Sequence, residues 1–168
     1  MNRLVHWYFK ALELTIVLCL AAMCLMVFAN VVLRHFFDSG INISAELSRF
    51  LFIWLTFLGA IVAMREGAHL GMDMLVHRLS GKALFAAVLT SQSLVFGCCV
   101  VLLWGLLRQH ALNMSNIGLL TGISMGVVYS VAYLCAASIG AMTLANIARL
   151  VTGRATAASL IRVPEAAE

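Results

Sequence analysis

Residues 11–33 read ALELTIVLCLAAMCLMVFANVVL, a run that is apolar through its whole middle. About 20 such residues cross a hydrocarbon core of about 30 Å as a helix. Three further apolar runs follow at residues 47–64, 83–107 and 123–150. A membrane β-barrel would show alternating segments of about 10 residues instead. The sequence therefore predicts four transmembrane helices.

The composition places the whole chain in the same class. Hydrophobic residues make up 63% of the 168 and charged residues 11%, against about 45–50% and about 25% in soluble domains. We expect an all-α integral membrane protein that forms one four-span domain surrounded by membrane lipids. The net charge of +4 comes from basic residues scattered along the chain. Because no basic stripe is present, a nucleic-acid partner is not expected.

Basic residues between the runs predict the orientation of the chain. Eight of them fall on the side that holds both termini, whereas Arg34 and Arg108 fall on the other side. Short loops rich in Lys and Arg stay in the cytoplasm, so we expect both termini to be cytoplasmic. The first run is longer than the core of about 7–15 residues that a signal peptide has, which favours a retained span.

The segment between the second and third runs has a helical pattern of its own. Its apolar residues at helical spacing are Met72, Leu75, Val76 and Leu79, and its other face holds Asp73, His77 and Arg78. This pattern predicts a short amphipathic helix over about residues 71–79, lying in the cytoplasmic interface. An irregular loop that dips apolar residues into lipid is the alternative. The tail, about residues 154–168, is expected to be flexible.

Polar groups deep in a span usually mark chemistry, because they are costly in hydrocarbon. The five histidines lie at or outside the ends of the runs, which disfavours a haem-binding membrane anchor. Glu13 lies near Lys10 at the rim of its run, which disfavours a self-contained homodimeric exporter with a deep carboxylate. The single proline, Pro164, is in the tail, so the spans look continuous, unlike those of transporter sites. We expect a protein that is not an enzyme, with no catalytic, metal-binding or substrate-binding residue and no cofactor, and keep the exporter and the haem-binding anchor as alternatives.

Polar residues gather instead at the end of the first run and the start of the second. Glu46 and Arg49 are three residues apart and share one face of a helix. Either they form a salt bridge within the chain, or they anchor a partner helix.

Small residues recur four positions apart in or beside the second and fourth runs, and such stripes allow helices to approach closely. They are Gly59 with Ala63, Gly122 with Gly126, Ala132 with Ala136 and Gly140, and Ala137 with Ala141 and Ala145.

Several motifs, in their order along the chain, resemble the small membrane (DctQ-like) subunit of tripartite ATP-independent periplasmic (TRAP) transporters. They are Asn30-Val31-Val32-Leu33-Arg34, then Glu46 and Trp54, then Gly59-Ala60, and finally Arg65-Glu66-Gly67-Ala68-His69-Leu70-Gly71-Met72-Asp73. The resemblance extends by motif from about residue 13 to residue 73, and over the rest by the four-span layout.

The resemblance implies a scaffold that braces a large, many-span membrane subunit in the bacterial inner membrane. The large subunit holds the substrate and sodium sites, and a periplasmic substrate-binding protein delivers an organic acid. By resemblance, the residues of this chain that belong to the family motifs or to the partner interface are Asn30, Arg34, Glu46, Arg49, Trp54, Gly59, Arg65, Glu66, His69 and Asp73.

Overall fold

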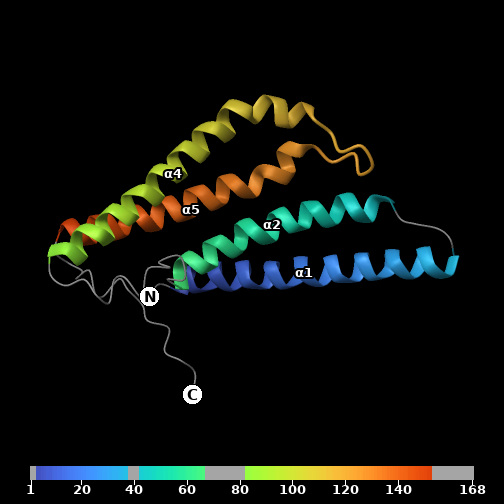
Figure 1. Cartoon of the computed structure of the whole chain (residues 1–168), viewed down its shortest axis with the longest axis horizontal. Helices are drawn as coiled ribbons and strands as arrows, with labels where there is room; N and C mark the ends of the chain where they lie inside the picture. The colour runs from blue at the N-terminus through green and yellow to red at the C-terminus, as the bar shows by residue number, and fades with distance from the viewer. Residues whose placement is uncertain (1–2, 38–41, 67–81, 153–168) are drawn as a thin grey trace, which may run out of the picture. The chain divides into compact units, whose positions relative to one another are not determined.

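The computed structural model describes residues 3–37, 42–66 and 82–152 (Figure 1). These residues form four helices: α1 (Arg3–Phe37), α2 (Asn42–Glu66), α4 (Lys82–Ser115) and α5 (Met125–Val151). All four are long and apolar enough to cross a membrane, which confirms the predicted all-α membrane class. The predicted interfacial helix (71–79) and the tail (154–168) lie outside the described residues.

The helices continue past the ends of the apolar runs. α1 has 35 residues and α4 has 34, so each is about 50 Å long at about 1.5 Å per residue. That exceeds the hydrocarbon thickness of about 30 Å, so these helices tilt or extend into the interface. Hydropathy marks the part of a helix inside lipid, whereas the backbone hydrogen bonds carry the helix on through Arg34 and Arg108.

The chain divides into two compact units. The first comprises residues 1–62 and 106–135, and the second comprises residues 63–105 and 136–168. The first unit therefore holds α1, most of α2, the end of α4 and the beginning of α5. Its core consists of buried apolar side chains from α1, α2 and α5; the largest are Phe9, Leu12, Phe50, Leu58, Ile61, Val128 and Val131.

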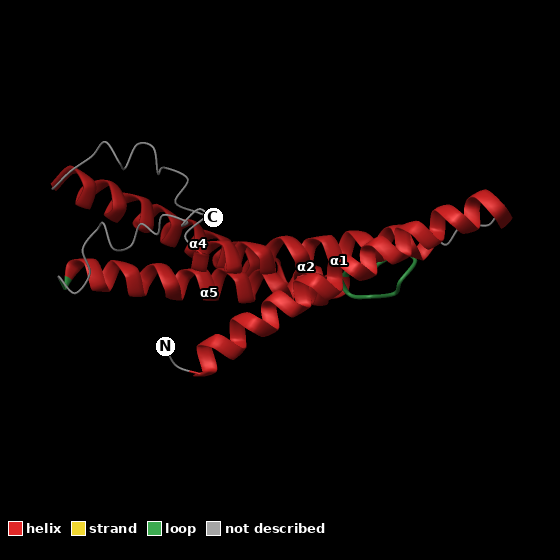
Figure 2. Cartoon of the chain, turned by 90° about the horizontal axis from the view of Figure 1, so that it is seen from below, coloured by secondary structure: helices red, strands yellow, loops and turns green. Residues whose placement is uncertain are grey.

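Within the first unit α1 and α2 lie side by side (Figures 1 and 2). Phe9, Leu12 and Cys19 are the buried residues of α1, and their spacing of three and seven places them on one helical face. Many other apolar side chains of α1 are exposed or half-buried. Only 6% of the apolar stretch of α1 is buried inside the chain, compared with 44% of that of α5.

The second unit packs the first part of α4 against the last part of α5. Val88 and Leu150 are buried together, with Leu84 against them. A Cβ atom added to Gly140 would lie 3.8 Å from the Cβ atom of Cys99, so the missing side chain allows close packing at this point. Along α5, one stripe of small residues is buried (Ala132, Ala136, Gly140), and the other is exposed (Ala137, Ala141, Ala145).

Candidate functional site

The connection between α4 and α5, residues 116–124, is an ordered turn that we call the α4–α5 loop. The Gly118 N–H donates to the carbonyl of Ile123 at 2.8 Å, and the Gly122 N–H donates to the carbonyl of Gly118 at 3.0 Å. Gly122 has a φ of 68°, a left-handed conformation that glycine adopts without steric strain. The expected helical pairing of Gly122 with Gly126 is therefore wrong, because Gly122 lies in the loop.

The carboxylate of Glu46, in α2, holds this loop. Its Oε2 atom accepts the N–H of Leu120 at 2.9 Å and that of Thr121 at 3.0 Å. The Glu46 side chain is 8% exposed, and a buried carboxylate needs such donors. A Cβ atom at Gly118 would lie 2.6 Å from Oε1 of Glu46. Glycine at position 118 thus makes room for the carboxylate.

Ser124 determines where α5 begins. Its hydroxyl oxygen accepts the N–H of Gly126 at 3.2 Å, as an N-cap residue does, and its O–H lies within bonding distance of the carbonyls of Asn113 and Met114. The helix therefore starts at Met125, two residues after the predicted start of the span at residue 123. The cap also ties the first turn of α5 to the end of α4.

Two further side chains link helices in the same unit. The Ser44 hydroxyl donates to the carbonyl of Met26 at 3.1 Å, joining α2 to α1. The Tyr133 hydroxyl donates to the carbonyl of Leu106 at 2.7 Å and lies 3.2 Å from Nδ1 of His110, joining α5 to α4. These contacts connect residues 18 to 27 positions apart, so no local sequence pattern signals them.

Arg49 lies beside the Glu46 contact without pairing to it. Among the described residues no ion pair joins Glu46 to Arg49, although both line one groove of about 440 Å³ with Ala45, Leu119 and Leu120. Arg49 is exposed, and Leu119 at the tip of the loop is 98% exposed. The groove thus combines a guanidinium with an apolar rim.

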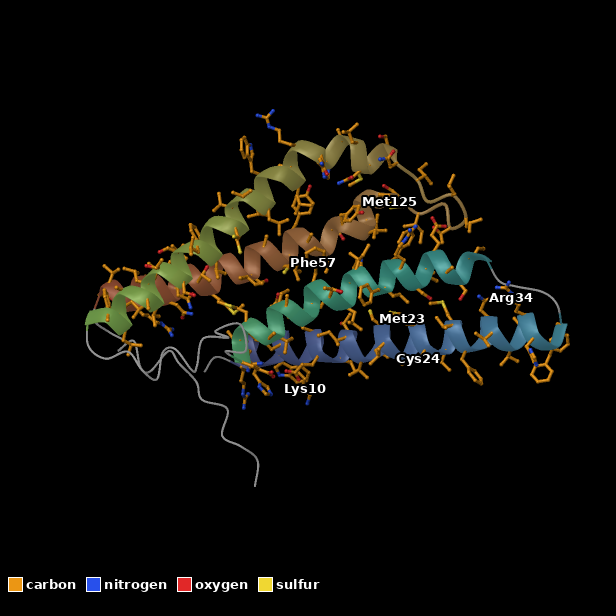
Figure 3. The ribbon with its side chains drawn as sticks, viewed as in Figure 1. Lys10, Met23, Cys24, Arg34, Phe57 and Met125 are labelled. Carbon is orange, nitrogen blue, oxygen red and sulfur yellow. The ribbon has the colours of Figure 1, made fainter. Side chains whose placement is uncertain are left out.

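The other residues of the predicted set lie apart from this groove. Arg34 is exposed in the last turn of α1, and Lys10 lies toward the opposite end of the helix (Figure 3). Asn30, Trp54, Gly59 and Arg65 are half-buried, and Glu66 is exposed at the end of α2. His69 and Asp73 lie outside the described residues. The structure therefore brings Glu46 and Arg49 to one groove and places the other described members of the set at separate positions along α1 and α2.

Within residues 3–37, 42–66 and 82–152, no group of three or more His, Cys, Asp or Glu side chains could hold a metal ion.

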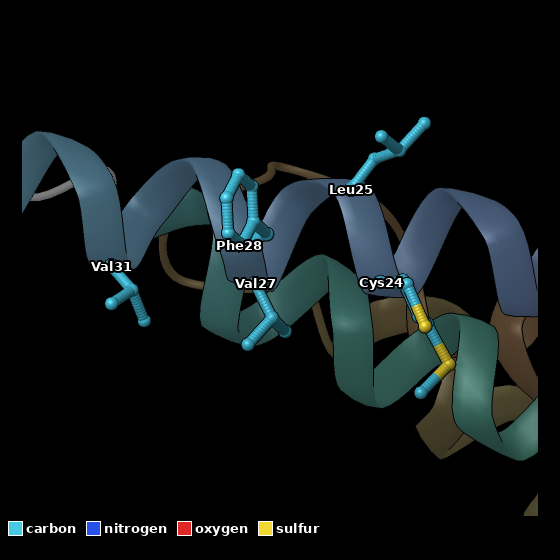
Figure 4. Close-up of a pocket in the computed structure, with 6 residues that line it drawn as sticks. Cys24, Leu25, Val27, Phe28 and Val31 are labelled. Carbon is cyan, nitrogen blue, oxygen red and sulfur yellow. The ribbon is translucent and has the colours of Figure 1, made fainter.

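Gln92 of α4 is a buried polar side chain that the sequence pattern does not single out. It is 2% exposed, and its Oε1 has no hydrogen-bond partner among the described residues. A second surface feature is an apolar groove of about 660 Å³ along α1, lined by Met23, Cys24, Leu25, Val27, Phe28 and Val31 (Figure 4).

Comparison with known proteins gives a consistent result. Residues 23–153 match the family model of the DctQ component of tripartite ATP-independent periplasmic transporters. Two TRAP transporter small permease proteins of Haemophilus influenzae are similar to the chain. One is 40% identical over 131 residues, covering 77% of this chain and 80% of that protein. The other is 33% identical over 129 residues, covering 77% and 78%.

A more distant relative is the C4-dicarboxylate TRAP transporter small permease protein DctQ of Vibrio cholerae. It is 29% identical over 92 residues, which cover 54% of this chain and 40% of that protein.

Proposed function

The chain belongs to the DctQ component family of tripartite ATP-independent periplasmic transporters, and from this we propose that it is the small scaffold subunit of a sodium-driven importer of an organic acid. In this proposal it braces a large, many-span transport subunit in the inner membrane, and a periplasmic binding protein delivers the substrate. The name of the Vibrio cholerae relative, which specifies a C4-dicarboxylate, supports an organic acid.

The observation that carries the scaffold role is how the chain uses its polar groups. Ser44, Glu46, Ser124 and Tyr133 all make hydrogen bonds that tie parts of this chain to one another. In contrast, α1 buries only 6% of its apolar stretch inside the chain. A chain that is held together by its own hydrogen bonds and presents a broad apolar helix face suits a subunit that packs against other membrane helices.

Two cations are the best anchors for the partner among the polar residues at the ends of α1 and α2. Arg34 and Arg49 are exposed, and within the described part of the chain neither guanidinium forms an ion pair. Glu46, in contrast, already accepts two backbone N–H groups of the chain. We therefore assign partner contact to Arg34 and Arg49, and internal support of the α4–α5 loop to Glu46. Of the remaining family-motif residues, we place Trp54 at the same interface.

The distribution of basic residues supports cytoplasmic termini. In that orientation the α4–α5 loop and the Arg49 groove face the periplasm. Leu119, Leu120 and Arg49 would then lie where the binding protein approaches the membrane.

Reconstituted vesicles test the proposed function. Uptake of labelled C4-dicarboxylate is measured with this chain alone, with the large subunit and binding protein, and with all three components. We expect uptake only with all three and only under an inward sodium gradient. Uptake by this chain alone, or full uptake without it, would contradict the proposal.

A further inference from the structure

The groove at the start of α2 holds a cation that the chain itself does not pair. Arg49 lines this groove with Ala45, Glu46, Leu119 and Leu120, and its side chain is exposed. The Oε2 atom of Glu46 already accepts two backbone N–H groups of the α4–α5 loop. Among the described residues, none forms a hydrogen bond or an ion pair with the Arg49 side chain. A guanidinium carries five N–H donors, so the groove presents a positive charge and several donors to its neighbour.

A contact between α1 and α2 shows which part of α1 lies beside Arg49. The Ser44 hydroxyl donates to the carbonyl of Met26 at 3.1 Å, and the two helices run antiparallel and side by side (Figure 1). Arg49 is five residues farther along α2, which is about 7.5 Å at about 1.5 Å per residue. The same rise along α1 leads from Met26 back to Ala21. Arg49 is therefore level with about Ala21, near the middle of the first apolar run.

The neighbouring part of α1 offers no counter-ion. α1 carries no charged residue between Glu13 and Arg34. Lipid phosphates lie beyond the hydrocarbon core, and Leu33, where the first apolar run ends, is 12 residues from Ala21, or about 18 Å along the helix. That distance is longer than an arginine side chain. Because a charge beside lipid chains is stabilised by pairing within protein, the anion that fits belongs to an adjoining membrane protein.

We propose that Arg49 binds a carboxylate, Asp or Glu, on a membrane helix of the large subunit. The inference rests on the proposed function, because it takes the large subunit as the neighbouring protein. A carboxylate accepts two parallel N–H bonds from one guanidinium, and each charge offsets the cost of the other beside lipid. Leu119 and Leu120, which are 98% and 52% exposed, then contact apolar residues next to this carboxylate.

Binding of the full-length chain to its cognate large subunit, both in phosphatidylcholine nanodiscs, tests this assignment. Arg49→Gln removes the charge, and we expect it to weaken binding about tenfold or more, as for close charge pairs across interfaces. Arg49→Lys keeps the charge without the paired N–H geometry and should weaken binding less. The matched control is Arg149→Gln, which removes an exposed arginine from the last turn of α5 and should leave the affinity unchanged.

A double-mutant cycle identifies the anion. Each Asp and Glu in the membrane helices of the large subunit is replaced by Asn or Gln, and binding to wild-type chain and to Arg49→Gln is compared. At one position the two losses should not add, because either substitution alone already removes the pair. The thermal stability of the isolated chain should be the same for wild type and Arg49→Gln, since Arg49 forms no bond within the described chain.

Four results separate the possible failures. If wild-type chain binds the large subunit and Arg49→Gln matches Arg149→Gln, the carboxylate assignment is wrong and the proposed function stands. The same holds if Arg49→Gln weakens only the docking of the periplasmic binding protein. If Arg49→Gln weakens binding and every double mutant is additive, no carboxylate of the large subunit pairs with Arg49, which also overturns the assignment. If wild-type chain does not bind the large subunit, the proposed function fails and the assignment with it.

Discussion

The carboxylate of Glu46 is buried and forms no ion pair with a described residue, and two backbone N–H groups of a loop more than 70 residues away satisfy it. The sequence predicts that Glu46 and Arg49 share one face of a helix. In the structure both lie on α2 and line one groove. The loop contact could not be predicted, because nothing local in residues 118–122 identifies the partner of Leu120 and Thr121. Glycine at 118 and at 122 was the available signal, and it indicates a turn without naming the group that the turn binds.

At the residue scale we predict that Glu46→Ala destabilises the isolated chain by about 1–3 kcal/mol, because two loop N–H groups lose their acceptor. Glu46→Gln keeps an acceptor oxygen and should cost less. Gly118→Ala should destabilise as well, because its Cβ would lie 2.6 Å from Glu46 Oε1. The measurement is the free energy of unfolding in detergent.

The control for this prediction is Glu66→Ala, which removes an exposed carboxylate from the other end of α2. It should change the stability by less than about 0.5 kcal/mol. Equal effects of Glu46→Ala and Glu66→Ala would mean that the loop does not depend on the carboxylate.

At the element scale, hydropathy predicts that four helices exist and where their apolar middles lie, but not where they end. α1 and α4 continue into polar sequence after Leu33 and Leu107, because polar residues outside the hydrocarbon do not stop a helix. The start of α5 depends on the Ser124 cap. The α1–α2 bond from Ser44 was missed, since serine near a helix start suggests capping rather than a bond to another helix.

The location of the termini sets the direction in which each helix crosses the membrane. With cytoplasmic termini, the tip of the α4–α5 loop is periplasmic. Alkaline phosphatase fused after Leu119 should be active, whereas a green fluorescent protein fused at either terminus should fluoresce. An active phosphatase fused after residue 168, or an inactive one after Leu119, would reverse the proposed orientation.

At the scale of the whole molecule, the sequence predicts the membrane class and the family, because both depend on composition and on motif order. It does not predict which polar residues form hydrogen bonds within the chain and which stay exposed, since that depends on contacts between distant segments. The structure assigns Ser44, Glu46, Ser124 and Tyr133 to internal ties. Arg34 and Arg49 remain exposed. In this arrangement, hydrogen bonds within the chain stabilise its own fold. Its exposed arginines and apolar helix surface suit a larger membrane partner.

The most direct test of the bracing role is the thermal unfolding of the large subunit with and without this chain in the same nanodiscs. A ligand that binds the folded state stabilises it by about 2.7 kcal/mol at 100 times its dissociation constant. The scaffold account predicts that the unfolding midpoint of the large subunit rises as this chain is added and continues to rise with the logarithm of its free concentration once it is in excess. An unchanged midpoint in a complex that demonstrably forms would contradict the claim that this chain braces its partner.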